Sequence, residues 1–188
     1  SGVRRAKWHK RSALTRELRE LADTDQLTGL LNRRSLEGLV RQRHADGSTQ
    51  AVVILLDVDH FKSINDGQGH AAADDVLVQV AQLLRSHLRR NDSVARYGGE
   101  EFLVLLADGD LASGGRLAES LRVALSGKDI VLGSGEILRV TASFGVAQGT
   151  LDPIGWHALV RAADTAMYAA KSLGRDRVQV AAGGRAAR

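Results

Sequence analysis

Three acidic residues stand where a folded chain would bring carboxylates together. Asp57 ends the apolar run 51–56, and Glu100 and Glu101 directly follow a Gly-Gly pair. If these segments are neighbouring strands, Asp57 and one of the glutamates converge, because successive side chains of a strand point to opposite faces. Clustered carboxylates without cysteine favour a hard cation, Mg²⁺ or Mn²⁺. Taken alone, Asp57 is equally well explained as a polar residue that ends a buried strand.

Two further segments carry polar groups of interest. Residues 61–70 are rich in glycine and polar side chains, so their backbone amides could cradle a phosphate and Asn65 could bind the edge of a base. Lys171 and Arg175 lie four residues apart across a helix end at Gly174. By itself this pair is explained as a basic last turn that complements the helix dipole.

The composition predicts one folded domain. The chain has 188 residues, of which 44% are hydrophobic and 26% charged, so a disordered chain is excluded and an aliphatic core is expected. Cysteine is absent, which excludes disulfides, thiol catalysis and thiolate metal sites. No apolar run approaches the roughly 20 residues of a membrane span, and no signal peptide is visible.

The net charge of +4 is concentrated at the two ends of the chain. Residues 1–22 hold seven Lys/Arg and two Asp/Glu, and residues 178–188 hold two Arg and no acid. The part between them, 23–177, has 17 Lys/Arg and 20 Asp/Glu. A nucleic-acid binder carries its positive patch on the folded domain, so we expect no nucleic-acid partner.

Hydrophobic periodicity and turn residues predict an α+β fold, with one mostly antiparallel sheet and helices packed on its faces. The continuously apolar run at 51–57 is typical of a strand buried on both faces, and Gly98-Gly99 indicates a tight hairpin between two strands. The predicted helices span residues 3–22, 33–44, 60–69 (a short helix or a loop), 71–89, 111–126 and 156–173, and the predicted strands span 51–57, 93–97, 101–107, 129–132, 137–148 and 177–181.

The first predicted helix has a short apolar seam. Leu14, Leu18 and Leu21 have the spacing of a coiled coil. A dimer stalk and a solvated helix that leads into the domain both remain open. Ser1-Gly2 without a preceding Met looks like a protease scar, so we expect the natural chain to extend upstream.

Four spaced motifs resemble the GGDEF family of diguanylate cyclases. They cover residues 25–34, residues 57–74, residues 96–102 in the Glu-Glu variant of the signature, and residues 163–175. The departures are small, because Ala73 stands where the family usually has Gly and Asp176 where Asn is common. We expect neither departure to abolish activity.

The resemblance implies a palm-like fold shared with nucleotidyl cyclases and an enzyme that condenses two GTP molecules into cyclic di-GMP plus pyrophosphate. It implies a homodimer in which two active sites face each other. It also implies two Mg²⁺ (or Mn²⁺) ions per active site, held by Asp57, the carbonyl of Val58 and Glu100. Glu101 is then a catalytic neighbour, either a ligand or a structural partner.

The resemblance also assigns substrate contacts. The backbone amides of Phe61 and Lys62 face the phosphates, and Asp59 and His60 have at most a structural role. The remaining contacts come from Gly98 and Gly99, which leave room for the nucleotide, Lys171 and Arg175, which neutralise the triphosphate, and Asn65 and Asp74, which fit guanine.

One motif outside the substrate site matches the family's Arg-x-x-Asp product-inhibition site. Arg89 and Asp92 lie at a fixed offset before Gly98 and would bind cyclic di-GMP. The alternative is an ordinary charged helix end.

The domain boundaries follow from these assignments. We expect a linker or signalling helix at 1–22, a catalytic domain at 23–181 and a disordered tail at 182–188. An upstream sensory domain would be missing from this fragment. A cytoplasmic location is expected, with membrane anchoring through the missing region left open. The rival functions are a degenerate module that binds GTP or cyclic di-GMP without turnover, and a different nucleotidyl cyclase or polymerase palm.

Overall fold

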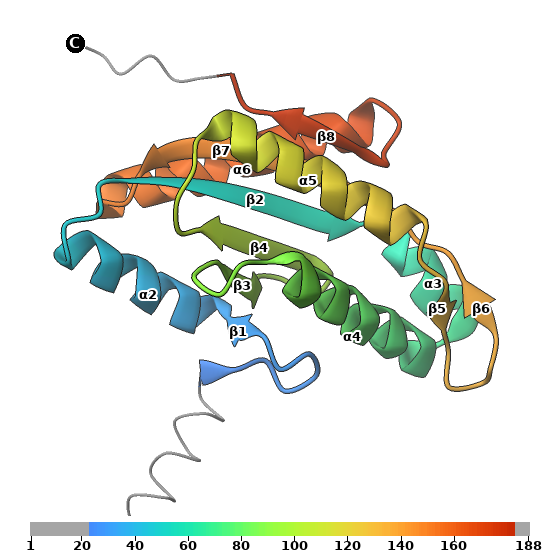
Figure 1. Ribbon diagram of the computed structural model, residues 1–188. Helices are drawn as coiled ribbons and strands as arrows, with labels where there is room; N and C mark the ends of the chain where they lie inside the picture. Colours follow the sequence, from blue (N-terminus) through green and yellow to red (C-terminus); the bar gives the residue numbers. More distant parts are fainter. Residues whose placement is uncertain (1–22, 183–188) are drawn as a thin grey trace, which may run out of the picture.

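The computed structural model describes residues 23–182, and Figure 1 shows a central sheet flanked by helices. The predicted helix at 3–22 and the predicted tail beyond Ala182 lie outside the described residues. No helix within residues 23–182 is long and apolar enough to cross a membrane. The elements are β1 (Leu31–Asn32), α2 (Arg33–Ala45), β2 (Gln50–Val58), α3 (Phe61–Gln68), α4 (His70–His87), β3 (Ser93–Arg96), β4 (Glu101–Leu106), α5 (Leu111–Ser126), β5 (Ile130–Val131), β6 (Ile137–Leu138), β7 (Ala142–Thr150), α6 (Pro153–Ser172) and β8 (Arg177–Val180).

The main sheet has six strands in the order β1-β3-β4-β2-β7-β8. The three inner pairings, β3 with β4, β4 with β2 and β2 with β7, are antiparallel, and only the two edge pairings are parallel. The predicted α+β fold with a mostly antiparallel sheet is therefore confirmed. Because β2 has a strand on each side and helices on each face, its continuous apolar run is buried as predicted.

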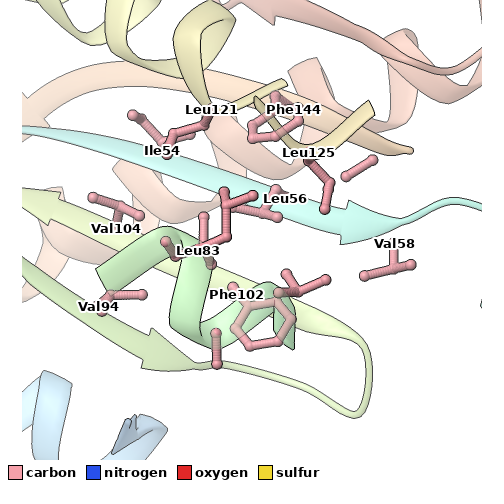
Figure 2. Close-up of a cluster of buried hydrophobic side chains, with 14 of the residues drawn as sticks. Ile54, Leu56, Val58, Leu83, Val94, Phe102, Val104, Leu121, Leu125 and Phe144 are labelled. Carbon is pink, nitrogen blue, oxygen red and sulfur yellow. The ribbon is translucent and has the colours of Figure 1, made fainter. Parts of the chain in front are cut away.

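Alternate side chains of β2 supply two separate cores. Figure 2 shows the first, in which Ile54 and Leu56 meet Leu121 and Leu125 of α5 and Leu83 of α4. The odd-numbered residues of β2 enter the second core, where they pack with α2 and α6. Since side chains alternate along a strand, the next odd-numbered residue after the apolar run, Asp57, faces α6.

Helix α6 lies unusually close to β7. A Cβ atom at Gly145 would overlap the carbonyl oxygen of Ala163 and the backbone of Met167, so only glycine fits at this point of the strand. Asp152 caps the start of the helix, because its side chain accepts a hydrogen bond from the amide of Gly155. Pro153 is the first helical residue, a position where its missing N–H is not needed. The close approach brings the last turns of α6 over the end of β2.

The structure corrects several predicted boundaries. The strand predicted at 137–148 is divided into β6 and β7, and β6 pairs with β5 in a small sheet of its own. The last helix begins at Pro153 rather than at Trp156. The two-residue strand β1 was not predicted, and it exists because it pairs with β3. The region 60–69 is a helix, α3, which ends at Gly69 with φ 89°.

Candidate active site

Strand register brings the acidic residues together. Asp57 near the end of β2 lies directly opposite Glu101 of β4, and the amide of Val58 donates to the carbonyl of Glu100 at 3.2 Å. The side chains of Asp57 and Glu100 lie close enough for each to affect the pKa of the other. Carboxylates that are 43 or more residues apart in the chain thus meet at one edge of the sheet, which is the convergence expected from the sequence.

The acidic cluster lacks enough positive charge. Burial raises the pKa of Asp57, and Lys171, whose Nζ lies 3.0 Å from Asp57 Oδ1, only partly opposes this. Burial and the neighbouring Asp57 raise the pKa of Glu100. Burial, Asp57 and Asp164 raise the pKa of Glu101. Each carboxyl group is therefore harder to ionise than in water, and a bound cation would relieve the repulsion.

The donor set fits a hard cation that also takes ligands from substrate. Asp57 Oδ1 is buried and accepts no well-aligned hydrogen bond from any described residue, although it forms the ion pair with Lys171. No cluster of three or more His, Cys, Asp or Glu side chains within residues 23–182 is arranged to hold a metal. Asp57, Glu100 and the carbonyl of Val58 supply two carboxylates and one carbonyl. Mg²⁺ commonly binds through one or two carboxylates and completes its ligands with water and phosphate oxygens.

Glu101 is placed differently from Glu100. It lines a polar cavity of about 260 Å³ between the sheet and α6, together with His157, Arg161 and Asp164. Arg33 forms another wall of this cavity, and its guanidinium lies 4.5 Å from the ring centroid of Tyr97.

The predicted hairpin between β3 and β4 is confirmed, but its turn differs from the prediction. The turn comprises residues 97–100, and neither Gly98 nor Gly99 has the positive φ of a two-residue Gly-Gly turn. A Cβ at Gly99 would meet no protein atom within 4 Å, whereas one at Gly98 would meet the flexible end of the Glu101 side chain. Gly99 therefore borders open space at the end of the acidic strand pair, whereas Gly98 packs against the Glu101 side chain.

An arginine that the sequence analysis did not single out holds this connection. Arg96 donates from Nε and Nη2 to the carbonyl of Gly99, at 3.1 and 2.7 Å, and from Nη1 to both carboxylate oxygens of Asp25. Although burial opposes ionisation, hydrogen bonds from Thr28 and the charge of Arg96 lower the pKa of Asp25. The Asp-x-x-Thr turn at 25–28 was a usable signal, because a side chain that caps its own turn is ordered enough to orient an arginine.

The remaining predicted substrate residues come from helix ends near the end of β2. Phe61 and Lys62 begin α3, whose N-cap residue His60 supplies no side-chain cap, so the first amides of the helix remain for a ligand. Asn65 of α3 has a buried Oδ1 with no hydrogen-bond partner among the described residues. Asp74 is exposed on α4, the helix packed against α3.

At the other side of the site, Lys171 lies in the last turn of α6 and Arg175 in the turn that follows it. Lys171 is ion-paired with Asp57, while the side chain of Arg175 is exposed. The two basic residues predicted for the triphosphate thus lie on consecutive turns of the chain. The structure brings Lys171, but not Arg175, into direct contact with the acidic cluster.

Asp59 has the structural role expected of it. Its carboxylate is buried and accepts three hydrogen bonds, from the hydroxyl groups of Ser143 at 2.7 Å and Thr141 at 2.6 Å and from the amide of Asp176 at 3.1 Å. It joins β2 to β7 and to the turn after α6. Its carboxylate is thus held within the fold by both oxygens.

Arg89 and Asp92 form a turn between α4 and β3. The Asp92 carboxylate accepts from the amides of Arg89, at 3.1 Å, and Ala107, at 3.0 Å. Two cavities of about 370 and 280 Å³ are both lined by Arg89 and Asp92. The side chain of Arg89 forms no hydrogen bond or ion pair within residues 23–182, so its guanidinium is available at both cavities.

Solved structures with this fold define the class of protein. The coiled coil and GGDEF domain of DgcB from Caulobacter crescentus, determined in complex with c-di-GMP, aligns over 96% of this chain and 96% of its own, with a TM-score of 0.88 and 29% sequence identity. The fold, with the acidic cluster at the end of β2, is that of a GGDEF domain.

The family model described as "Diguanylate cyclase, GGDEF domain" matches residues 22–177. The chain therefore belongs to the GGDEF-domain family of diguanylate cyclases, as its motifs indicated. It is 45% identical over 167 residues to diguanylate cyclase DgcP of Pseudomonas aeruginosa and 43% identical over 164 residues to the response regulator PleD of Caulobacter vibrioides. These alignments cover 87% and 85% of this chain but only 24% and 36% of the two relatives.

Proposed function

We propose that this domain is a diguanylate cyclase, which joins two GTP molecules into cyclic di-GMP and releases two pyrophosphates. The observation that carries the proposal is the buried Asp57 between Glu100 and Lys171, beside the open space at Gly99. A site that combines acidic oxygens with a lysine and vacant backbone amides suits a metal-bound triphosphate. The membership of the family and the named cyclase among the relatives support the same activity.

Asp57, the Val58 carbonyl and Glu100 would hold two Mg²⁺ or Mn²⁺ ions. When bound, such ions stabilise the charge on the attacking and leaving oxygens of an in-line displacement. Metal binding is the principal role of Glu100. Its raised pKa also suits it to accept the proton of the 3′-hydroxyl. Glu101 lines the neighbouring cavity, where it would act as a further ligand or as a structural partner of the other two acids.

The other side chains bind and orient GTP. Lys171 and Arg175 neutralise the triphosphate, and the first amides of α3, at Phe61 and Lys62, donate to its oxygens. Asn65 has an unsatisfied acceptor that the amino group of guanine would satisfy, and Asp74 would accept from the same base edge. Adenine has neither the 2-amino group nor the N1–H of guanine, so GTP is preferred over ATP.

The reaction needs two copies of the domain. In the proposed homodimer each site holds one GTP, and each 3′-oxygen bonds to the α-phosphorus of the opposite GTP. The bond from that phosphorus to pyrophosphate breaks, and the 3′-hydroxyl proton is released. A single domain can bind GTP but cannot close the ring.

We propose that Arg89 and Asp92 form the site of product inhibition. The unpartnered guanidinium of Arg89 beside two cavities supports this, because a planar guanidinium can bind phosphate and stack on guanine. Asp92 holds the turn in shape and retains lone pairs for guanine. Arg89→Ala is expected to lengthen the linear phase of the reaction without changing its initial rate. Progress curves that stall as early as those of the parent would refute it.

We also propose that the domain is cytoplasmic, where GTP is available. A sensory region elsewhere in the protein would control its activity. The two relatives above are much longer than the part they share with this chain, which supports a regulatory region.

The activity is tested by incubating the purified domain with GTP and Mg²⁺ and separating the nucleotides by chromatography. Cyclic di-GMP is expected from GTP, with no cyclic dinucleotide from ATP. GTP that binds but remains unchanged would instead support the degenerate binding module. Equal turnover of ATP would support a different nucleotidyl cyclase.

A further inference from the structure

The turn that carries Arg175 has an unusual backbone. Three consecutive residues have positive φ, namely Gly174 at 115°, Arg175 at 63° and Asp176 at 42°. Glycine adopts this conformation readily, but residues with a Cβ are strained in it. Two such residues in a row persist only where surrounding contacts hold them. The contacts that hold this turn therefore decide where the Arg175 side chain is presented.

Asp176 is held from two sides. Its amide donates to the buried carboxylate of Asp59 at 3.1 Å, and its own carboxylate accepts from Arg122 Nη1 of α5 at 2.9 Å. Arg122 also pairs with Glu119, one turn earlier on α5, at 2.7 Å. The side chains of Arg122 and Asp176 are 21% and 40% exposed, so water only partly screens their ion pair.

The ionic character of this contact depends on a departure from the family pattern. Position 176 is commonly Asn in the motif that the chain resembles, and here it is Asp. Asn would accept a hydrogen bond from Arg122 but would carry no charge. Arg122 lies on α5, and within residues 23–182 its side-chain hydrogen bonds and ion pairs are with Glu119 and Asp176. The pair therefore connects the substrate turn to a helix on the other face of the sheet.

We propose that Arg122 is a positioning residue for the nucleotide. Through its ion pair with Asp176, it fixes the turn at 174–176 and so places the guanidinium of Arg175 at the triphosphate of GTP. This inference rests on the proposed function, in which Arg175 binds that triphosphate. A residue that acts in this way changes the affinity for nucleotide and leaves the chemical step largely unaffected.

The test compares three variants of the full chain with the parent. Arg122→Ala removes the pair, and Glu119→Gln removes the charge of the other partner of Arg122 without touching the turn. Arg122→Ala combined with Asp176→Asn removes both charges of the pair. Because Asn tolerates the left-handed backbone, this double variant separates loss of the pair from the effect of an unpaired carboxylate. For each protein we would measure KM and kcat for GTP, and the Kd of a non-hydrolysable GTP analogue with Mg²⁺ by calorimetry.

Arg122→Ala is expected to raise KM and the analogue Kd about fivefold, the upper range for loss of a partly exposed ion pair, with kcat changed less than about twofold. Glu119→Gln is expected to match the parent, and the double variant is expected to keep the raised KM and Kd of Arg122→Ala, because it also lacks the ion pair.

Unchanged KM and Kd in Arg122→Ala would overturn the inference. So would a joint loss of kcat and thermal stability in Arg122→Ala, because Arg122 would then only stabilise the fold. Parental KM and Kd in the double variant would also overturn it, because the effect of Arg122→Ala would then come from the unpaired charge of Asp176 and not from the loss of the pair. If the parent makes no cyclic di-GMP, the proposed function fails, and the analogue titration still decides the role of Arg122.

Discussion

At the scale of single residues, the site is an acidic cluster that the fold keeps together against its own repulsion. Asp57, Glu100 and Glu101 have raised pKa values, each chiefly because of burial, and Lys171 is the cation in direct contact. Such perturbed acids are characteristic of functional sites. Stability alone would favour apolar or neutral residues at these positions.

Replacing Glu100 by Gln is expected to lower the rate of cyclic di-GMP formation by orders of magnitude, because it removes a charged metal ligand while keeping the shape of the side chain. Glu119→Gln makes the same chemical change at an exposed position of α5 and is the matched control. Initial rates from GTP with Mg²⁺, with circular dichroism as a check of folding, measure the effect. A Glu100→Gln rate within a few-fold of the control would disprove the metal assignment.

The two ends of GTP are expected to respond to different residues. Asp74→Asn should reduce the preference for GTP over ATP, because it removes the carboxylate that accepts from the N–H donors of guanine. A site built to pair with such donors discriminates strongly against a base that lacks them. Lys171→Ala should weaken binding of both nucleotides, because it removes a triphosphate contact. Competition binding with the two nucleotides separates the cases, and an unaltered preference in Asp74→Asn would show that Asp74 does not contact the base.

At the scale of secondary-structure elements, two glycines have opposite requirements. Gly145 is occluded by the backbone of α6, whereas Gly99 faces open space. Gly145→Ala is therefore expected to destabilise the domain by about 1–3 kcal/mol, as overpacking does. Gly99→Ala is expected to leave the melting temperature unchanged and to lower activity by intruding on the nucleotide. Thermal unfolding and initial rates of both variants check this, and equal destabilisation would contradict it.

Most helices and strands were predictable from periodicity, but their ends depended on partners distant in the chain. The two residues of β1 have no pattern of their own and form a strand only because Leu31 and Asn32 pair with β3. The segment 137–148 is uniformly suited to a strand, yet Ile137 and Leu138 pair with β5 while Ala142 begins the pairing with β2. Tertiary contacts, and not the local sequence, therefore determine which strand each segment pairs with.

At the scale of the whole molecule, the free energy of unfolding should depend on pH in a way that reflects the acidic cluster. A carboxyl group with a raised pKa binds its proton more tightly when folded. Its contribution to stability is complete below the ordinary pKa, here 3.8 for Asp57 and 4.5 for Glu100 and Glu101, and is lost as pH rises through the folded pKa. Asp25 has a lowered pKa, so its contribution to stability is complete above the ordinary value of 3.8. That contribution is lost as pH falls through the folded pKa.

Mg²⁺ should therefore stabilise the domain more at pH 7 than at pH 5, since it binds the ionised carboxylates. The melting temperature measured with Mg²⁺ and after chelation, at both pH values, tests this. A shift of about 2 °C or more is expected at pH 7, and Asp57→Asn should abolish it. An equal shift at both pH values, or the same shift in Asp57→Asn, would contradict the cluster as the binding site.

The family and the acidic cluster were accessible from the sequence because their residues occur in short motifs. The contacts that position them were not. Arg96 with Asp25 and Arg122 with Asp176 join residues 71 and 54 positions apart, and only the folded chain brings them together. The hairpin at Gly98-Gly99 was correctly predicted, but its two-residue turn was not, because sequence alone does not reveal φ.

The most direct test of the central claim is the stoichiometry and concentration dependence of the reaction of GTP with this domain and Mg²⁺. The proposal predicts two pyrophosphates for each cyclic di-GMP formed. It also predicts a rate that rises faster than linearly with protein concentration, because each copy supplies half of the reacting pair. Pyrophosphate without cyclic di-GMP, or bound GTP that stays intact at every protein concentration, would contradict the assignment as a diguanylate cyclase.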